Sequence, residues 1–226
     1  MKMMVGVVLL AAVVVAAIGG YMVFKPPAQA SGPITAAPVA GSARAATTAT
    51  PVYAIDPNAS KARFVVDEIL RGAPKTVVGE TNQVAGQITA DLDDLDTAKV
   101  GTIMINARTL TTDADGRNRM LQNQILQTDQ HEYITFTPKQ LIGIPDSAAV
   151  GQQITFQMVG DLTIRGMTRE TTFDVVMTPT TDEQLQGTAS TSIRYADWGV
   201  SIPQVPSVAG VGEQVALQLE FVARTA

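Results

Sequence analysis

The 226-residue sequence contains no cysteine and a single histidine, His131. Without cysteine the chain has no thiol nucleophile, disulfide, zinc–thiolate site or iron–sulfur cluster. One histidine cannot build a multi-histidine metal site, and any Ser-His-Asp triad would have to use it. A lone histidine beside Glu132, with no G-x-S-x-G motif in the chain, is more typical of a solvated loop position. We therefore expect no catalytic residues and no metal site.

Charged and aromatic residues are also scarce, at 16% and 5% of the chain. The chain has 16 Lys+Arg and 21 Asp+Glu, which gives a formal net charge of -5. An acidic chain repels a phosphate backbone, and so few rings do not form a base-stacking surface, so nucleic acid is not an expected partner. The hydrophobic fraction of 46% is normal for a globular protein and excludes a wholly disordered chain.

Residues 3–24 carry no charge between Lys2 and Lys25. About 20 apolar residues cross a bilayer, whereas the apolar core of a cleaved signal peptide is nearer 7–15 residues. We therefore interpret residues 1–25 as a signal anchor that crosses the membrane through residues 3–24. A cleaved signal is the alternative, with Ala28-Gln29-Ala30 as the site before Ser31, and either interpretation exports the rest of the chain.

Residues 26–52 form a Pro/Ala/Thr-rich linker with few large apolar side chains. Such a stretch cannot bury enough apolar surface to offset its ordering entropy. We expect a disordered, semi-extended tether between the anchor and a globular domain at residues 53–226.

In the globular part the dominant hydrophobic period is two, which is typical of strands with one buried face. A tight hairpin is expected at 165–168, a polar connection at 91–96 and one short helix at 113–126. About eight antiparallel strands of this kind either stack as a sandwich or close as a barrel, and periodicity does not separate the two. The expected strands are 62–68, 84–92, 99–108, 132–142, 153–164, 170–178, 185–195 and 213–223.

Four motifs, in order along residues 53–225, are similar to those of the YceI-like polyisoprenoid-binding proteins of bacteria. The most specific is the run from Gly160 to Arg169, GDLTIRGMTR, which resembles the family's G-D-L-T-I-x-G-V-T-K/R hairpin. The other three are Asp56-Pro57 with Ser60 and Phe64, Leu110-Thr111-Thr112 leading through Arg117 and Leu121 to Ile134-Thr135-Phe136, and Ile193-Arg194 with Asp197-Trp198-Gly199.

This resemblance implies an all-β fold, an eight-stranded antiparallel lipocalin-like barrel with one short helix. It implies an apolar tunnel that holds an isoprenoid lipid, such as a quinone tail or a polyprenyl chain, for sequestration or transport without a catalytic step. No cofactor is expected apart from this lipid. The expected location is the bacterial inner membrane, with the domain facing the periplasm or the cell exterior, or secretion if the signal is cleaved. A homodimer is left open.

The chain departs from the family's pattern at positions that are polar or aromatic in the family. Ala59 and Met120 stand where the family has histidines, and His131-Glu132 stand where it has Tyr-Pro. If these positions contact a ligand head group, that head group differs here.

Inward-facing apolar side chains are the candidates for the tunnel wall, and an ordinary packed core is the alternative interpretation of the same pattern. Arg117 and Arg119 on the expected helix are candidates for binding a polar or anionic head group, with a solvated helix face as the alternative. The wall candidates, including Trp198 as a closure of one end, are Phe64, Phe136, Phe156, Met158, Leu162, Phe173, Val175, Met177, Trp198, Leu217, Leu219 and Phe221.

Two other functions stay open from the sequence. A solid-core all-β surface domain would bind proteins through an edge strand or an exposed patch and would carry no lipid. A hydrolase with paired carboxylates would have to draw on Asp93, Asp94 and Asp197, although no spacing supports it.

Overall fold

The computed structural model describes residues 25–36, 50–204 and 208–225. The expected membrane segment, residues 3–24, and residues 37–49 of the expected linker lie outside this part. No helix within the described ranges combines the length and the hydropathy that a membrane crossing requires.

Strands account for most of the regular structure, and thirteen of them pair in one antiparallel sheet. The all-β prediction is therefore confirmed, whereas the predicted number of eight strands is wrong. In chain order the strands are β1 (Val52–Ile55), β2 (Lys61–Leu70), β3 (Ala73–Thr81), β4 (Val84–Ala85), β5 (Gln87–Asp91), β6 (Asp94–Val100), β7 (Ile103–Asn106), β8 (Tyr133–Ile142), β9 (Ile154–Ile164), β10 (Met167–Thr181), β11 (Gln184–Arg194), β12 (Val208–Val211) and β13 (Gln214–Thr225). The number is wrong because short strands such as β1, β4 and β12 carry too few residues to show a period.

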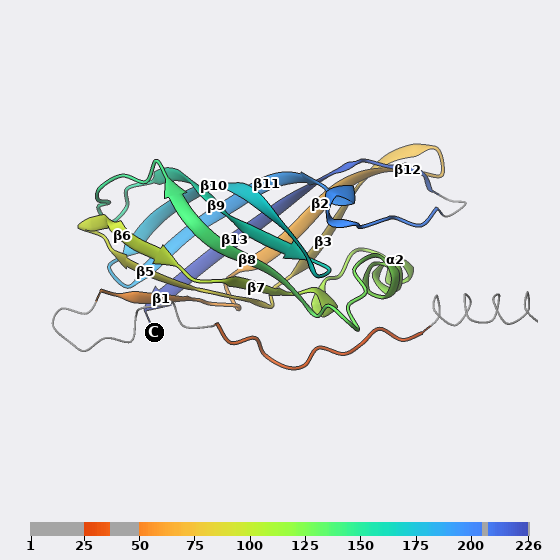
Figure 1. Ribbon diagram of the computed structural model, residues 1–226, viewed down its shortest axis with the longest axis horizontal. Helices are drawn as coiled ribbons and strands as arrows, with labels where there is room; N and C mark the ends of the chain where they lie inside the picture. Colours follow the sequence, from red (N-terminus) through yellow and green to blue (C-terminus); the bar gives the residue numbers. More distant parts are fainter. Residues whose placement is uncertain (1–24, 37–49, 205–207, 226) are drawn as a thin grey trace, which may run out of the picture.

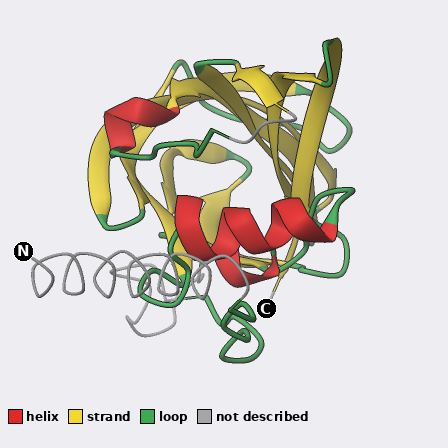
Figure 2. Cartoon of the chain, turned by 90° about the vertical axis from the view of Figure 1, so that its right-hand side faces the viewer, coloured by secondary structure: helices red, strands yellow, loops and turns green. Residues whose placement is uncertain are grey.

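The sheet curls because most strands pair with their neighbours in the chain and the last strand, β13, pairs with the first two. β7, β8, β9, β10, β11 and β13 are successive neighbours, and β13 pairs with both β1 and β2. β5 pairs with β1, while β4, which precedes β5 by one intervening residue, pairs with β7 at the other end of this series. Figure 2, a view along the strands, shows the resulting curvature around the interior.

β1 and β2 lie one after the other along β13 and are separated by a turn. Residues 56–60 separate β1 from β2, and Ser60 is buried at this break. The Ser60 hydroxyl donates to the Val222 carbonyl at 3.3 Å and accepts from the Val222 N–H at 3.0 Å. The side chain thus replaces ladder hydrogen bonds that the interruption removes, which keeps both pieces beside β13.

One short helix lies at one end of the sheet, as predicted for residues 113–126 (Figure 1). α2 (Asp115–Met120) continues into η2 (Leu121–Ile125), a π-helical turn that buries Leu121 and Gln122. The other helical pieces are the 3₁₀ turns η1 (Ala107–Thr109) and η3 (Tyr195–Trp198). We call the end that carries α2 and η2 the helix-bearing end; the loop at 143–153, which follows the last residue of β8, lies at the far end.

The prediction of a disordered linker is wrong for its first part. Residues 25–36 have no regular secondary structure, but Lys25, Gln29 and Ser31 make hydrogen bonds to the helix-bearing end of the sheet. The contacts come from polar groups of the folded domain, so the linker's own composition does not reveal them.

Candidate functional site

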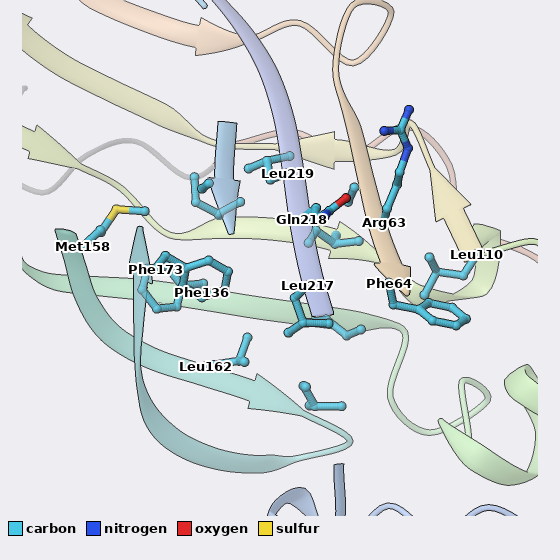
Figure 3. Close-up of a pocket in the computed structure, with 16 residues that line it drawn as sticks. Arg63, Phe64, Leu110, Phe136, Met158, Leu162, Phe173, Leu217, Gln218 and Leu219 are labelled. Atoms are coloured by element: carbon cyan, nitrogen blue, oxygen red, sulfur yellow. The ribbon is translucent and has the colours of Figure 1, made fainter. Parts of the chain in front are cut away.

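The interior of the curled sheet contains an apolar cavity of about 100 Å³. Its wall is built mainly from β2, β7, β8, β9, β10 and β13, together with Leu110 just beyond η1. Seven of the predicted wall residues line it: Phe64, Phe136, Met158, Leu162, Phe173, Leu217 and Leu219 (Figure 3).

A second cavity of about 50 Å³ lies next to the first and has only apolar lining residues. Ile103 and Met158 line both cavities, so their side chains lie between the two spaces. Four further wall candidates line the second cavity: Phe156, Val175, Met177 and Phe221.

Alternation along the strands explains why the predicted residues meet. Side chains two apart on β8, β9, β10 and β13 point to the same face, and the sheet's curl brings these faces together. The Phe136 and Phe173 rings meet edge to face, with centroids 4.8 Å apart. Figure 3 shows both rings on the cavity side of the sheet, whereas Arg63 extends away from it.

Three glycines make room for aromatic rings in the wall, a role that was not predicted from the sequence. A Cβ on Gly79 would lie 2.1 Å from the Phe64 ring, and one on Gly187 would lie 2.8 Å from the Phe221 ring. A Cβ on Gly160 would lie 2.8 Å from the Phe136 ring and 2.4 Å from the Thr137 carbonyl oxygen. The sequence signal is a glycine at an inward position of a strand.

Trp198 lines neither cavity. It is buried in η3, and its indole Nε1 donates to the Leu162 carbonyl at 3.0 Å. Its ring therefore packs against the helix-bearing end of β9, while the Leu162 side chain faces the first cavity.

The two predicted head-group arginines differ in their surroundings. Arg117 donates to Glu68 at 2.8 Å and also pairs with Asp113, so its guanidinium fastens α2 to the sheet. Arg119 is exposed, and it makes no hydrogen bond or ion pair with any residue that the structure describes. Of the two, Arg119 is the one whose charge is available to a ligand.

A polar cluster beside η1, formed by Asn106, Arg108 and Glu132, was not found from the sequence. Arg108 Nη1 donates to Glu132 Oε2 at 2.7 Å, and the fully buried Asn106 donates to Glu132 Oε1 at 3.2 Å. Burial alone would raise the pKa of Glu132, but hydrogen bonds from Ser31, the Arg108 charge and the Asn106 amide hold this pKa below its ordinary value. The cluster lies outside both cavities.

The acidic residues considered for hydrolysis do not come together. Asp93 and Asp94 lie at the turn between β5 and β6, which hydrogen-bonds to the loop at the far end. Asp197 lies in η3, beside the helix-bearing end of β9. Within the described part of the chain there is no group of three or more His, Asp or Glu side chains that could hold a metal ion.

Comparison with known proteins identifies relatives of the same fold. A family model described as YceI-like domain matches residues 53–223. A polyisoprenoid binding domain from Saccharophagus degradans, implicated in plant cell wall breakdown, superposes with a TM-score of 0.61 at 16% identity, over 77% of this chain and 98% of that domain. BcnA from Burkholderia cenocepacia superposes with a TM-score of 0.59 at 16% identity, over 74% and 98% of the two chains. A UPF0312 protein of Staphylococcus epidermidis is 28% identical over 141 residues, which are 60% of this chain and 75% of that protein.

Proposed function

Because the chain belongs to the YceI-like family, we propose that its globular domain binds an isoprenoid lipid inside the curled sheet. The lipid class is a quinone tail or a polyprenyl chain, and the role is sequestration or transport without chemistry. The observation that carries this proposal is the pair of adjacent apolar cavities, whose walls contain eleven of the twelve predicted residues. A related solved structure is a polyisoprenoid binding domain, which agrees with this ligand class.

Burial supplies the affinity in this proposal. Each methylene removed from water contributes about 0.8 kcal/mol, so a long prenyl chain gains enough free energy without specific polar contacts. The head group would then extend toward the helix-bearing end, where Arg119 is exposed.

The size of the cavities defines what binding requires. At about 100 and 50 Å³ they are smaller than typical ligand sites of about 300–1,000 Å³. A prenyl chain therefore fits only if the two cavities merge and widen. Met158 lies between them, and its unbranched side chain adapts readily to a new neighbour.

The same small volume favours a second candidate function, a solid-core all-β domain that binds other proteins and carries no lipid. Exposed apolar side chains on β2 and β3, Ile69 and Val78, would then contribute to the working surface.

For the location, we propose that residues 3–24 anchor the chain in a bacterial inner membrane and that the domain faces the periplasm or the cell exterior. The support is the uncharged apolar run between Lys2 and Lys25. Cleavage before Ser31, which would release a secreted domain, is the alternative.

Native mass spectrometry of the full chain, purified from cells that make prenyl lipids, tests the function. We expect a stoichiometric added mass that organic extraction releases as a prenyl lipid. A bare protein mass that stays unchanged after incubation with ubiquinone and polyprenol would contradict lipid binding and favour the solid-core interaction domain. The same spectrum shows whether the chain forms a homodimer.

A further inference from the structure

Ser31 binds the carboxylate of Glu132 with both of its hydrogen-bond donors. Its backbone N–H lies 2.7 Å from Glu132 Oε1, and its hydroxyl lies 2.5 Å from Glu132 Oε2. The partners are 101 residues apart in the chain, so this is a tertiary contact rather than a local turn. A short segment of irregular chain is thereby fixed on the folded domain.

The guanidinium of Arg108 joins the segment to the domain from the other side. Its Nη1 donates to the Gln29 carbonyl at 3.0 Å as well as to Glu132. Its Nε and Nη2 donate to the carbonyls of Thr128 and Asp129, at 2.8 and 3.3 Å. All three guanidinium nitrogens therefore donate hydrogen bonds to protein groups, which fixes the orientation of the guanidinium group.

The residues that bind the segment, Arg108 and Glu132, are largely buried in the domain. The side chains of Arg108 and Glu132 are only 15% and 11% exposed, so their pairing is screened by water less than a surface ion pair is. Asn106, which is fully buried, fixes Glu132 by donating to Oε1.

A second contact ties the segment to the helix. The amide of Asn123, in η2, donates to the Lys25 carbonyl at 2.7 Å, and the Lys25 ammonium lies 3.5 Å from Asp129. The neighbouring Gln122 donates to the carbonyls of Arg108 and Leu110, and Leu110 lines the first cavity. The segment thus contacts the helical turn that is itself bonded to the cavity wall.

From these contacts we infer that residues 25–36, which we call the strap, are a docking element for the domain's own helix-bearing end, and that the strap holds this end against the bilayer. Lys25 directly follows the uncharged run of residues 3–24 and already contacts the domain, so the chain has no slack between the two. The orientation rests on the proposed anchoring of residues 3–24; the docking does not. The cavity end that carries Leu110 then faces the lipid source.

The absence of cysteine makes the orientation directly measurable, because one introduced cysteine takes one fluorophore. Gln130→Cys places it at the helix-bearing end, and Ser147→Cys places it in the loop at the far end; both positions are exposed. The full chain is reconstituted in phosphatidylcholine–phosphatidylglycerol vesicles that contain a lipid with a nitroxide on its head group. We expect severalfold stronger quenching at position 130 than at position 147.

Two strap variants separate docking from general perturbation. Ser31→Pro removes both donors to Glu132 and the hydroxyl that accepts from Arg108 Nη1 at 3.3 Å, while every residue of the domain stays unchanged. We expect it to remove most of the difference in quenching. Thr35→Pro is the matched control, because Thr35 is exposed and makes no hydrogen bond with any residue that the structure describes; it should keep the difference. Equal quenching at both positions in the parent chain overturns the orientation. An undiminished difference in Ser31→Pro overturns the inference that the strap holds this end against the bilayer.

Hydrogen exchange of the full chain in detergent tests the docking without the bilayer. We expect strap peptides containing Ser31 to exchange at least tenfold more slowly than in Glu132→Ala. Exchange at the unprotected rate in the parent chain overturns the docking, and an intact mass that lacks residues 1–30 overturns the orientation. None of these readouts depends on bound lipid, so a failure here is distinguishable from a failure of the proposed function.

Discussion

Two glycines show how strongly the effect of one methyl group depends on its surroundings. Gly79 faces the Phe64 ring across β2 and β3, whereas nothing lies within 4 Å of a Cβ at Gly116 in α2. At the first position a methyl group meets a ring of the cavity wall. At the second it meets solvent, and only helix propensity changes.

We therefore expect Gly79→Ala to lower the free energy of unfolding by about 1–3 kcal/mol and to weaken lipid binding, because the Phe64 ring must move into the cavity. Gly116→Ala is the control and should raise the free energy of unfolding by up to about 1 kcal/mol. Urea unfolding of both variants, with the prenyl lipid measured by extraction, checks this. A Gly79→Ala domain with unchanged stability would show that Phe64 is free to move elsewhere.

Glu132 predicts a pH dependence of the strap. Its pKa in the folded chain lies below the ordinary value, so its ionised form stabilises the docked state above the ordinary carboxyl range. This stabilisation disappears as the pH falls through the lowered pKa, because a protonated carboxyl no longer accepts both Ser31 donors and no longer pairs its charge with Arg108. Hydrogen exchange of the strap, corrected for the intrinsic pH effect, should therefore accelerate in acid. Glu132→Gln should show fast exchange at neutral pH and little further acid effect.

At the scale of elements, large apolar side chains at alternate positions determined which strands were predictable. β9, β10 and β13 have such residues along their lengths, and their positions were predicted to within a few residues. β3 was missed because its inward positions include Gly79 and Thr81, and β6 because only Leu95 is fully buried, so that residues 94–96 were interpreted as a polar connection. Their pairing partners, rather than their own residues, make these segments strands.

Turn chemistry gives a test at this same scale. The β2–β3 turn has positive φ at both central residues, 51° at Arg71 and 83° at Gly72, which favours Asn-Gly. Arg71→Asn should raise the free energy of unfolding by about 0.5 kcal/mol, since asparagine tolerates this conformation better. Arg71→Val, with a β-branched side chain, should lower it. Thermal melts of the two variants should shift in opposite directions; shifts of the same sign would contradict the turn's role.

For the molecule as a whole, the sequence predicted the cavity wall better than the groups around its end. Periodicity is enough to place Phe156, Val175 and Phe221 on the inner face. Trp198 and Arg117 belong to irregular or helical segments whose partners, the Leu162 carbonyl and Glu68, are distant in the chain. The strap was unpredictable for the same reason, because its contacts depend on Arg108 and Glu132 being brought together by the fold.

The partition between the two cavities gives a prediction about the whole interior. Met158→Ala should merge them, so the domain should lose about 2–5 kcal/mol of unfolding free energy while its occupancy by a long prenyl chain rises. Met167→Ala is the matched control, because Met167 is 39% exposed at the β9–β10 hairpin and should change neither quantity. Urea unfolding together with the lipid-to-protein ratio in native mass spectra measures both effects. If lipid occupancy falls in step with stability, Met158 contributes to a packed core rather than to an adjustable partition, and the solid-core function is favoured.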